Sequence, residues 1–224
     1  QIKTELGSYV ALYEINMDKN DAEHISIPIT DKLTKRWGIT ADQLYQDTIK
    51  VQAAWNQPLL ADLLEMGAYL NGGTRPDNLL SADKIDDTGL YVLTNYKLYN
   101  GAAMIVHDEM AQKIGNLLQM DYYILPSTVH ELLVYPDNGV ISITQLQEMV
   151  KSVNATDVLP KDRLSDKVLF YNQQERRLEL ATEREEYFED KTEDTQEKKE
   201  LAEGKDKSES EKKEDKSLKF SNRL

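Results

Sequence analysis

The fold is decided by residues 90–154, LYVLTNYKLYNGAAMIVHDEMAQKIGNLLQMDYYILPSTVHELLVYPDNGVISITQLQEMVKSVN, where strand and helix signals alternate most clearly. Residues 90–94 are aromatic, branched and aliphatic, which predicts a buried strand. The pair Asn100-Gly101 favours the positive φ angles of a tight turn. Residues 102–106 are therefore expected to return as a second strand.

A helix and a third strand are expected after this hairpin. Asp108 is placed to cap the helix. Its apolar residues fall on one face at the helical period: Met110, Ile114, Leu117 and Leu118. Residues 122–125 predict the strand, which Pro126 is expected to stop because proline has no N–H to donate to a sheet ladder.

The second half of the stretch repeats this pattern. Residues 131–135 predict a strand, and residues 136–139 (PDNG) predict a turn. Thr144 followed by Gln147 matches a capping box that opens a helix running through Val153. The order strand–strand–helix–strand–strand–helix predicts an α+β fold with a mainly antiparallel sheet and helices packed on one face.

The preceding residues predict two strands and then helices. Residues 8–17 alternate as a strand, with residues 24–29 as its neighbour. A short helix is expected to end at Trp37, before Gly38. Thr40 with Gln43 matches a capping box for a longer helix. Trp37 and Trp55 are expected to anchor these helices on the sheet. Pro58 is expected to begin another helix.

The domain boundaries follow from composition. Residues 1–182 are expected to form one α+β domain, whose sub-halves 1–70 and 89–182 are joined by the polar loop 71–88. Near its end, residues 167–171 and 177–181 predict a hairpin. Because the chain begins at Gln1 rather than Met, we expect this domain to lack an N-terminal portion.

A charged, low-complexity tail is expected at residues 183–224. Charges of both signs crowd together there, and apolar residues nearly vanish. Such a segment buries too little apolar surface to offset the entropy lost on ordering, which predicts disorder. The tail is either a solvated segment or a partner-binding arm that ends in Leu218, Phe220 and Leu224.

Composition limits the classes of partner. The 224 residues carry a net charge of −13, and residues 1–182 alone hold 16 Lys/Arg against 25 Asp/Glu. An acidic body repels phosphate backbones, which disfavours direct nucleic-acid binding. No stretch is apolar enough to cross a bilayer, so no membrane association is expected. The absence of cysteine excludes disulfides and thiolate chemistry and is compatible with a cytoplasmic location.

Two histidines beside carboxylates are the candidates for chemistry. Residues 107–109 (HDE) and 130–131 (HE) would form a metal or acid–base site if their turns met, with His24 as a third member. On an extended strand, however, His130 and Glu131 point to opposite faces. No H-E-x-x-H spacing is present. No catalytic, cofactor-binding or metal residue is therefore assigned.

Two other motifs favour structural interpretations. Ser127 and Thr128 lie near His130 in sequence, but the G-x-S-x-G elbow of a nucleophilic serine is absent, so we interpret them as turn or capping residues. Residues 71–74 (NGGT) are rich in glycine, but no Gly-Lys-Ser/Thr follows them. We expect them to end a helix rather than bind phosphate.

A set of motifs resembles a known family. The motifs are residues 36–40 (RWGIT), 90–95 (LYVLTN), 100–103 (NGAA), 122–131 (YYILPSTVHE), 137–139 (DNG) and 153–166 (VNATDVLPKDRLSD). Together they resemble an uncharacterised bacterial domain family of unknown function, found in integrative, conjugative and phage-related elements of Gram-positive gut bacteria. The resemblance covers residues 1–182, and it implies a cytoplasmic accessory protein of mobile DNA without an assigned activity.

These observations favour a non-enzymatic protein that binds an unknown protein partner within a mobile genetic element. The first alternative is a metal-assisted hydrolase that uses His107, Asp108, His130 and Glu131. The second alternative is an acidic nucleic-acid mimic, which predicts carboxylates laid out in rows on one face.

Overall fold

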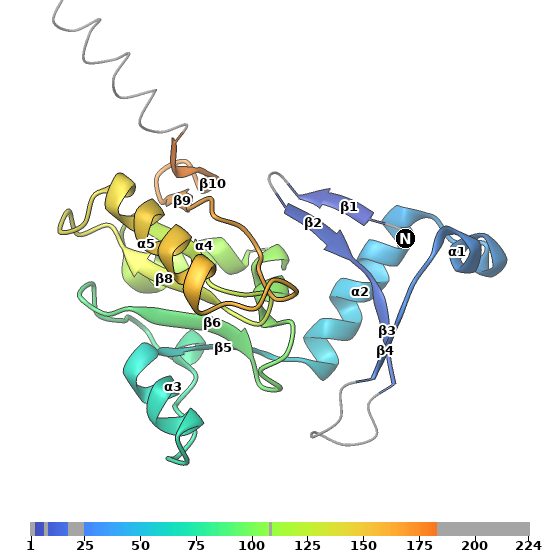
Figure 1. Ribbon diagram of the computed structural model, residues 1–224, viewed down its shortest axis with the longest axis horizontal. Coiled ribbons are helices and arrows are strands. Elements are labelled where there is room, and N and C mark those ends of the chain that lie inside the picture. Colours follow the sequence, from blue (N-terminus) through green and yellow to red (C-terminus); the bar gives the residue numbers. More distant parts are fainter. Residues whose placement is uncertain (1–2, 7–8, 18–24, 108, 183–224) are drawn as a thin grey trace, which may run out of the picture. The chain divides into compact units, whose positions relative to one another are not determined.

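The largest sheet of the structure has six strands in the order β10-β9-β7-β8-β6-β5 (Figure 1). Every neighbouring pair in it is antiparallel. Its strands are β5 (Pro58–Asp62), β6 (Tyr91–Asn95), β7 (Tyr122–Pro126), β8 (Leu132–Pro136), β9 (Leu169–Asn172) and β10 (Arg177–Leu180). The antiparallel sheet and the C-terminal hairpin, β9–β10, match the expectations from the sequence.

This computed structural model describes residues 3–6, 9–17, 25–107 and 109–182. The chain divides into two units, Gln1–Ala181 and Thr182–Leu224, and all the elements described below belong to the first. The disordered tail expected at residues 183–224 lies outside the described residues. Within the described ranges, none of the helices combines the length and the hydropathy that a bilayer crossing needs.

Helices cover both faces of the large sheet. On one face, Tyr122 and Ile124 of β7 pack with residues of α4 (Met110–Leu118) and of two short 3-10 helices, η1 (Leu79–Ser81) and η2 (Gly101–Val106). On the other face, the alternate residues Tyr123 and Leu125 pack against α5 (Ile143–Thr156). Next to them, α3 (Leu63–Leu70) covers β5 and β6.

The α+β class is confirmed, whereas the expectation that helices pack on one face is corrected. All five residues of β6 and all five of β7 are buried. Strands that bury successive residues must be covered on both sides, because successive side chains point to opposite faces. The helical face of α4 is confirmed, since Met110, Ile114, Leu117 and Leu118 are all buried.

The returning strand expected at residues 102–106 is instead η2. Asn100 does take a positive φ of 52°, as its turn signal indicated. Strand β6, however, already has two neighbours, β5 and β8, so no free edge is left for a hairpin partner. The segment packs onto the sheet as a 3-10 helix and buries Ala102 and Met104 in the core.

The expectation that a helix begins at Pro58 is also wrong, because Pro58 is the first residue of strand β5. Leu59, Leu60 and Ala61 are fully buried, since they lie in a strand that is covered on both faces. The helix α3 starts only at Leu63. There the Asp62 carboxylate accepts the backbone N–H groups of the first turn, as an N-cap does.

Two helix starts differ from the expected ones. Helix α5 begins two residues early, because Ser142 and Gln145 form the capping box rather than Thr144 and Gln147. Asp108, the expected cap of α4, lies outside the described residues. The residue that precedes α4 is Glu109, which has a positive φ of 71°.

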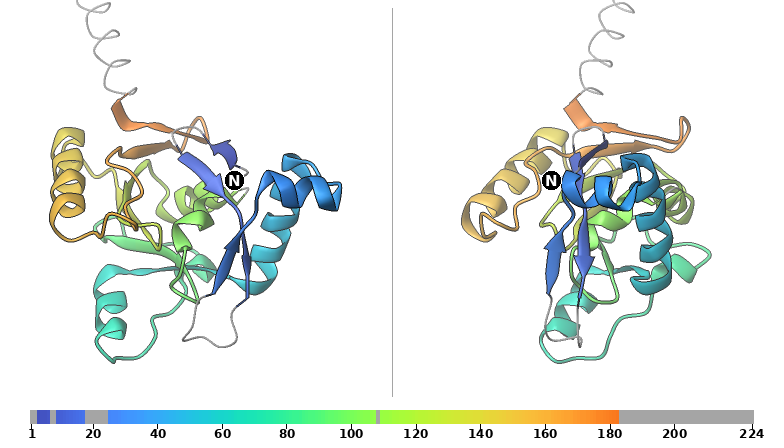
Figure 2. Two further views of the ribbon diagram at one scale, coloured as in Figure 1. Left: turned by 45° about the vertical axis from the view of Figure 1, so that its right-hand side comes forward. Right: turned by 90° about the vertical axis from the view of Figure 1, so that its right-hand side faces the viewer.

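The described residues before β5 form two hairpins and two helices. The hairpins pair β1 (Lys3–Leu6) with β2 (Tyr9–Leu12) and β3 (Glu14–Asn16) with β4 (Ser26–Pro28). The helices are α1 (Asp31–Trp37) and α2 (Ala41–Trp55), with Thr40 capping α2 as expected. Both views in Figure 2 place α2 beside the β3–β4 hairpin.

A small separate core joins these N-terminal elements. It is centred on Tyr13, Ile29 and Leu44. Trp37 does not anchor α1, because 45% of it is exposed, and the side chain of Trp55 lies outside the described part of the chain. The Tyr45 hydroxyl of α2 donates a hydrogen bond to the carbonyl of Val106 in η2 (3.2 Å).

The segment expected to be a polar loop, residues 71–88, contributes to the main core. It contains η1, and its residues Leu80 and Ile85 are buried beside α4 and the sheet. The backbone N–H of Ile85 donates to the carbonyl of Leu117 in α4 (3.0 Å). The segment therefore packs against the sheet and α4.

Asn78 closes the outer edge of β5. The bonds from Leu63 N to Leu90 O and from Tyr96 N to Gln57 O show that odd-numbered residues of β5 face β6. Pro58 and Leu60 therefore direct their backbone groups outward. The Asn78 side chain donates to the Pro58 carbonyl (2.9 Å) and accepts from Leu60 N–H (3.2 Å), as a paired strand would.

We expect the substitution Asn78→Ala to lower the free energy of unfolding by about 1–3 kcal/mol, because it leaves partly buried backbone groups of β5 without partners. Urea denaturation followed by circular dichroism measures this loss. The matched control is Asn71→Ala, which removes one exposed side-chain bond to Gly67 and should cost less than about 0.5 kcal/mol. Equal losses in the two variants would contradict the edge-closing role.

Candidate functional site

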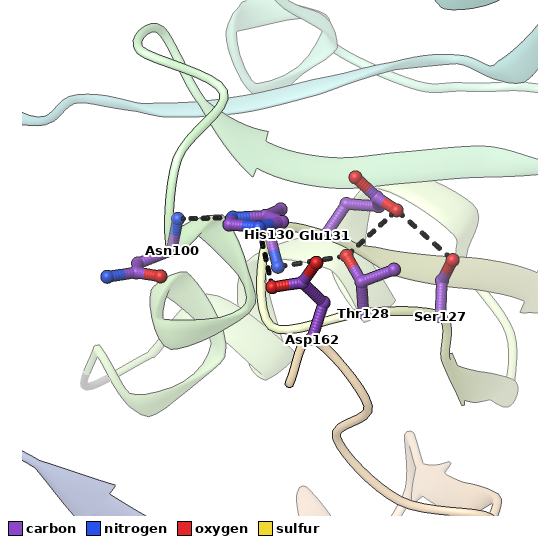
Figure 3. A network of polar contacts seen from close by, with 6 residues as sticks. All are labelled: Asn100, Ser127, Thr128, His130, Glu131 and Asp162. Atoms are coloured by element: carbon purple, nitrogen blue, oxygen red, sulfur yellow. Dashed lines mark hydrogen bonds and ion pairs between the residues drawn. The ribbon is translucent and has the colours of Figure 1, made fainter. Parts of the chain in front are cut away.

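Three segments that are distant in sequence meet at His130 (Figure 3). His130 lies in the turn between β7 and β8. In this turn, the backbone N–H of Val129 donates to the carbonyl of Asp162, which lies between α5 and β9 (2.9 Å). The Val129 carbonyl accepts from the N–H of Ala102, in the segment after β6 (3.2 Å). The backbone alone therefore joins the three segments.

Both ring nitrogens of His130 face a partner. Nδ1 accepts the backbone N–H of Asn100 (3.2 Å), and Nε2 lies 3.5 Å from the Asp162 carboxylate. An Nδ1 that accepts a hydrogen bond carries no proton, so the neutral ring holds its proton on Nε2, toward Asp162. The ring also packs against Tyr99, with 5.2 Å between ring centroids.

Glu131 belongs to a separate set of contacts within the same turn. One of its carboxylate oxygens accepts the hydroxyls of Ser127 (3.1 Å) and Thr128 (3.0 Å). The Thr128 hydroxyl oxygen in turn accepts the backbone N–H of His130 (2.9 Å). Figure 3 shows the side chains of His130 and Glu131 directed away from each other, although both residues lie in the turn before β8 rather than in a strand.

The close approach of the segments depends on Gly101. The Thr94 hydroxyl of β6 donates to the His130 carbonyl (2.8 Å). A Cβ at Gly101 would collide with both the Thr94 hydroxyl and this carbonyl. Glycine is required here because the backbone of η2 lies directly against these two groups.

This arrangement binds loops together, and both ring nitrogens of His130 are engaged in it. A general base needs a lone pair that faces its substrate, but the Nδ1 lone pair of His130 is directed at the amide of Asn100. The hydroxyls of Ser127 and Thr128 do not donate to the ring of His130, because both donate to Glu131. The geometry therefore favours a structural role, in which hydrogen bonds hold three segments together, over a role in proton transfer.

The two histidines that the sequence pairs with carboxylates lie in different segments of the structure. His107 lies at the end of η2, whereas His130 lies in the β7–β8 turn. No group of three His, Asp or Glu side chains that could hold a metal ion occurs in the described ranges. His24 and Asp108 lie outside those ranges. Sequence reasoning did not identify Asn100 and Asp162 as the partners of His130. No helical or strand period relates residues that are 30 or more positions apart.

A second polar feature lies where β5 ends and β6 begins. The Tyr91 hydroxyl donates to the Asp86 carbonyl (2.6 Å). Burial, together with the negative charges of Asp86, Asp62 and Asp87, raises the pKa of Tyr91 to about 12. Hydrogen bonds from the backbone and hydroxyl of Thr88 lower the pKa of Asp86. The negative charges of three aspartates therefore disfavour ionisation of one tyrosine hydroxyl.

A shallow hollow lies on the surface of α4. It is lined by Glu109, Met110, Gln112, Lys113 and Asn116. All five residues belong to α4 or to its first flanking position, so within the described part of the chain no second element contributes to the hollow. It does not form a site with either polar feature described above.

The fold and these contacts define an α+β protein in which a six-stranded antiparallel sheet is covered on both faces and its loops are joined at one histidine. The chain belongs to a family of unknown function, DUF5688, whose model matches residues 9–173. No match was found among curated proteins or among solved structures.

The substitution Gly101→Ala should destabilise the protein by about 1–3 kcal/mol or more, because the added methyl group collides with backbone that cannot move aside. The matched control is Gly67→Ala in α3, where an added Cβ meets no atom within 4 Å. It should be stabilising by about 0.5–1 kcal/mol through helix propensity. Thermal and urea unfolding of both variants measure the difference, and a stable Gly101→Ala variant would contradict the close approach.

Tyr91 should make stability depend on alkaline pH. Its folded pKa of about 12 lies above the usual value near 10, so its stabilising contribution is complete below pH 10 and is lost as the pH rises to 12. Tyr91→Phe should therefore lose less stability than the parent protein between pH 10 and 12. Denaturation at several pH values measures this change, and parallel pH profiles for the two proteins would refute it.

Proposed function

We propose that this protein is a non-enzymatic protein-binding protein of the bacterial cytoplasm and an accessory factor of a mobile genetic element. The mobile-element context is what the resemblance of its motifs implies. The non-enzymatic part of the proposal is supported by the contacts of His130, and the choice of a protein partner is supported by charge.

The observation that carries the proposal is the engagement of His130 on both sides of its ring. The Asn100 amide occupies one nitrogen, and the Asp162 carboxylate faces the other. A histidine held in this way orders the loops that surround it. Its role is then comparable to that of Thr94, whose hydroxyl bonds the His130 carbonyl.

Charge favours a protein partner over a nucleic acid. Residues 1–182 contain 16 Lys/Arg and 25 Asp/Glu. Such a surface repels phosphates and attracts basic protein surfaces, and complementary charge raises the rate of protein association. The charges of Asp62, Asp86 and Asp87 around Tyr91 are a local example of this excess.

The same three carboxylates also favour the second candidate, an acidic nucleic-acid mimic. A mimic would occupy the basic surface of a DNA-binding protein, so it is a special case of protein binding. It requires acidic side chains in rows with phosphate-like spacing over a whole face. Three carboxylates at one end of the sheet are consistent with a smaller contact, so general protein binding is the better supported function.

The test uses the full chain as bait in an extract of its native host, with mass spectrometry of the retained proteins. We expect one reproducible partner encoded within the same mobile element. The variant His130→Asn keeps an acceptor for Asn100, so it should fold and retain this partner. Phosphoester or peptide hydrolysis that depends on added metal, and is lost in a folded His130→Asn variant, would overturn the proposal in favour of an enzyme.

A further inference from the structure

We infer that the end of the sheet where β5 finishes and β6 begins is a docking surface for a basic, aliphatic segment of the protein partner. This inference rests on the proposed function and names the place and the chemistry of the contact. The surface, called the acidic end below, comprises Asp62, Leu64, Asp86, Asp87 and Val140.

Three turns of the chain lie side by side at this end. Strands β5 and β8 both run antiparallel to β6, so they finish where β6 starts, and Asp62 is the register partner of Tyr91. The Asn138 side chain, in the turn after β8, donates to the carbonyl of Asp87 in the loop before β6 (3.2 Å). Figure 1 shows the start of α3, this loop and this turn at the same end of the sheet.

In both Asp62 and Asp86, Oδ1 accepts hydrogen bonds from nearby residues, so the second carboxylate oxygen is the one that would face a partner. Asp86 and Asp87 are exposed, and Asp62 is half-buried as the cap of α3. The ion pairs of His130 with Asp162 and of Arg177 with two glutamates involve none of these three carboxylates. The loop of residues 83–90 contains three aspartates and one lysine. Its uncompensated negative charge would attract Lys or Arg.

Two aliphatic side chains flank these carboxylates. Leu64 follows Asp62 by two residues and is 81% exposed, and Val140 follows Asn138 by two residues and is 76% exposed. The Asn138 side chain accepts the Val140 N–H (3.1 Å) while it contacts Asp87, which fixes the turn beside the acidic loop. Across the neighbouring strands β5, β6 and β8, the residues at this end are therefore Leu64, then Asp86 and Asp87, then Val140.

This order indicates the chemistry of the occupant. A single exposed aliphatic residue needs no explanation. Here, however, two of the most exposed aliphatic side chains bracket the carboxylates, so a segment with Lys or Arg between apolar residues would cover both kinds of group. The charges would mainly accelerate association and make it depend on salt, and burial of the leucine and valine would slow dissociation.

The test begins with a displayed library of random 12-residue peptides, selected on the immobilised full chain. We expect the selected peptides to combine Lys or Arg with Leu, Ile or Val. Each is then synthesised, and its Kd is measured by fluorescence anisotropy. The Kd should rise at least fivefold for the double variant Asp86→Asn/Asp87→Asn and for the double variant Leu64→Ser/Val140→Ser, and it should rise between 50 and 200 mM salt.

Matched controls lie outside the acidic end. Leu70→Ser removes a leucine that is 67% exposed at the other end of α3, and Asp77→Asn removes an exposed carboxylate close to Asn78, near the start of β5. Both should leave the Kd within twofold of the parent value. Circular dichroism and thermal unfolding of every variant separate loss of binding from loss of fold.

Each other outcome has a distinct meaning. Peptides that bind the double variants as tightly as the parent chain would show that the acidic end is the wrong surface, while protein binding itself would stand. Selection of acidic or uncharged peptides would refute the basic chemistry of the partner. A library that yields no reproducible sequence would count against the proposed function as well as against this surface.

Discussion

The burial of β6 and β7 on both faces is the constraint on which the rest of the structure depends. Since successive side chains of these strands enter opposite cores, the sheet needs α4, η1 and η2 on one side and α3 and α5 on the other. The chain must therefore pass from one face of the sheet to the other several times, and the loops that make these connections lie at the two ends of the sheet. The His130 contacts and the acidic end both lie at such connections.

Local patterns predicted the elements well where each element is defined by its own residues. The apolar face of α4, the strand at residues 90–94 and the hairpin β9–β10 all follow from residue type and period. The predictions failed where the neighbour decided the outcome. Residues 102–106 resemble a strand, but β6 already has two partners, and the leucines after Pro58 are divided between β5 and α3 at the capping residue Asp62.

Only the residue types of the candidate site, and not the contacts between them, were predictable from the sequence. His130 and Glu131 are visible in the sequence as possible chemical groups, but the turn that holds them, rather than a strand, sets the directions of their side chains. What decides the role of His130 is a backbone N–H of Asn100 and a carboxylate 32 positions away. A backbone donor has no residue-type signature, and a contact between distant loops has no period, so neither was predictable from this one sequence.

The contact of Asn78 with β5 has a consequence for encounters between copies of the chain. An open strand edge is a template on which a second molecule can extend the sheet, which is how many aggregates begin. With β5 obstructed, the remaining edge of the large sheet is β10, a strand of four residues that alternates Arg177 and Glu179 with leucines. Because β10 is short and carries charged residues, the addition of strands from other molecules at this edge is disfavoured. The sheet is therefore protected from polymerisation at both edges.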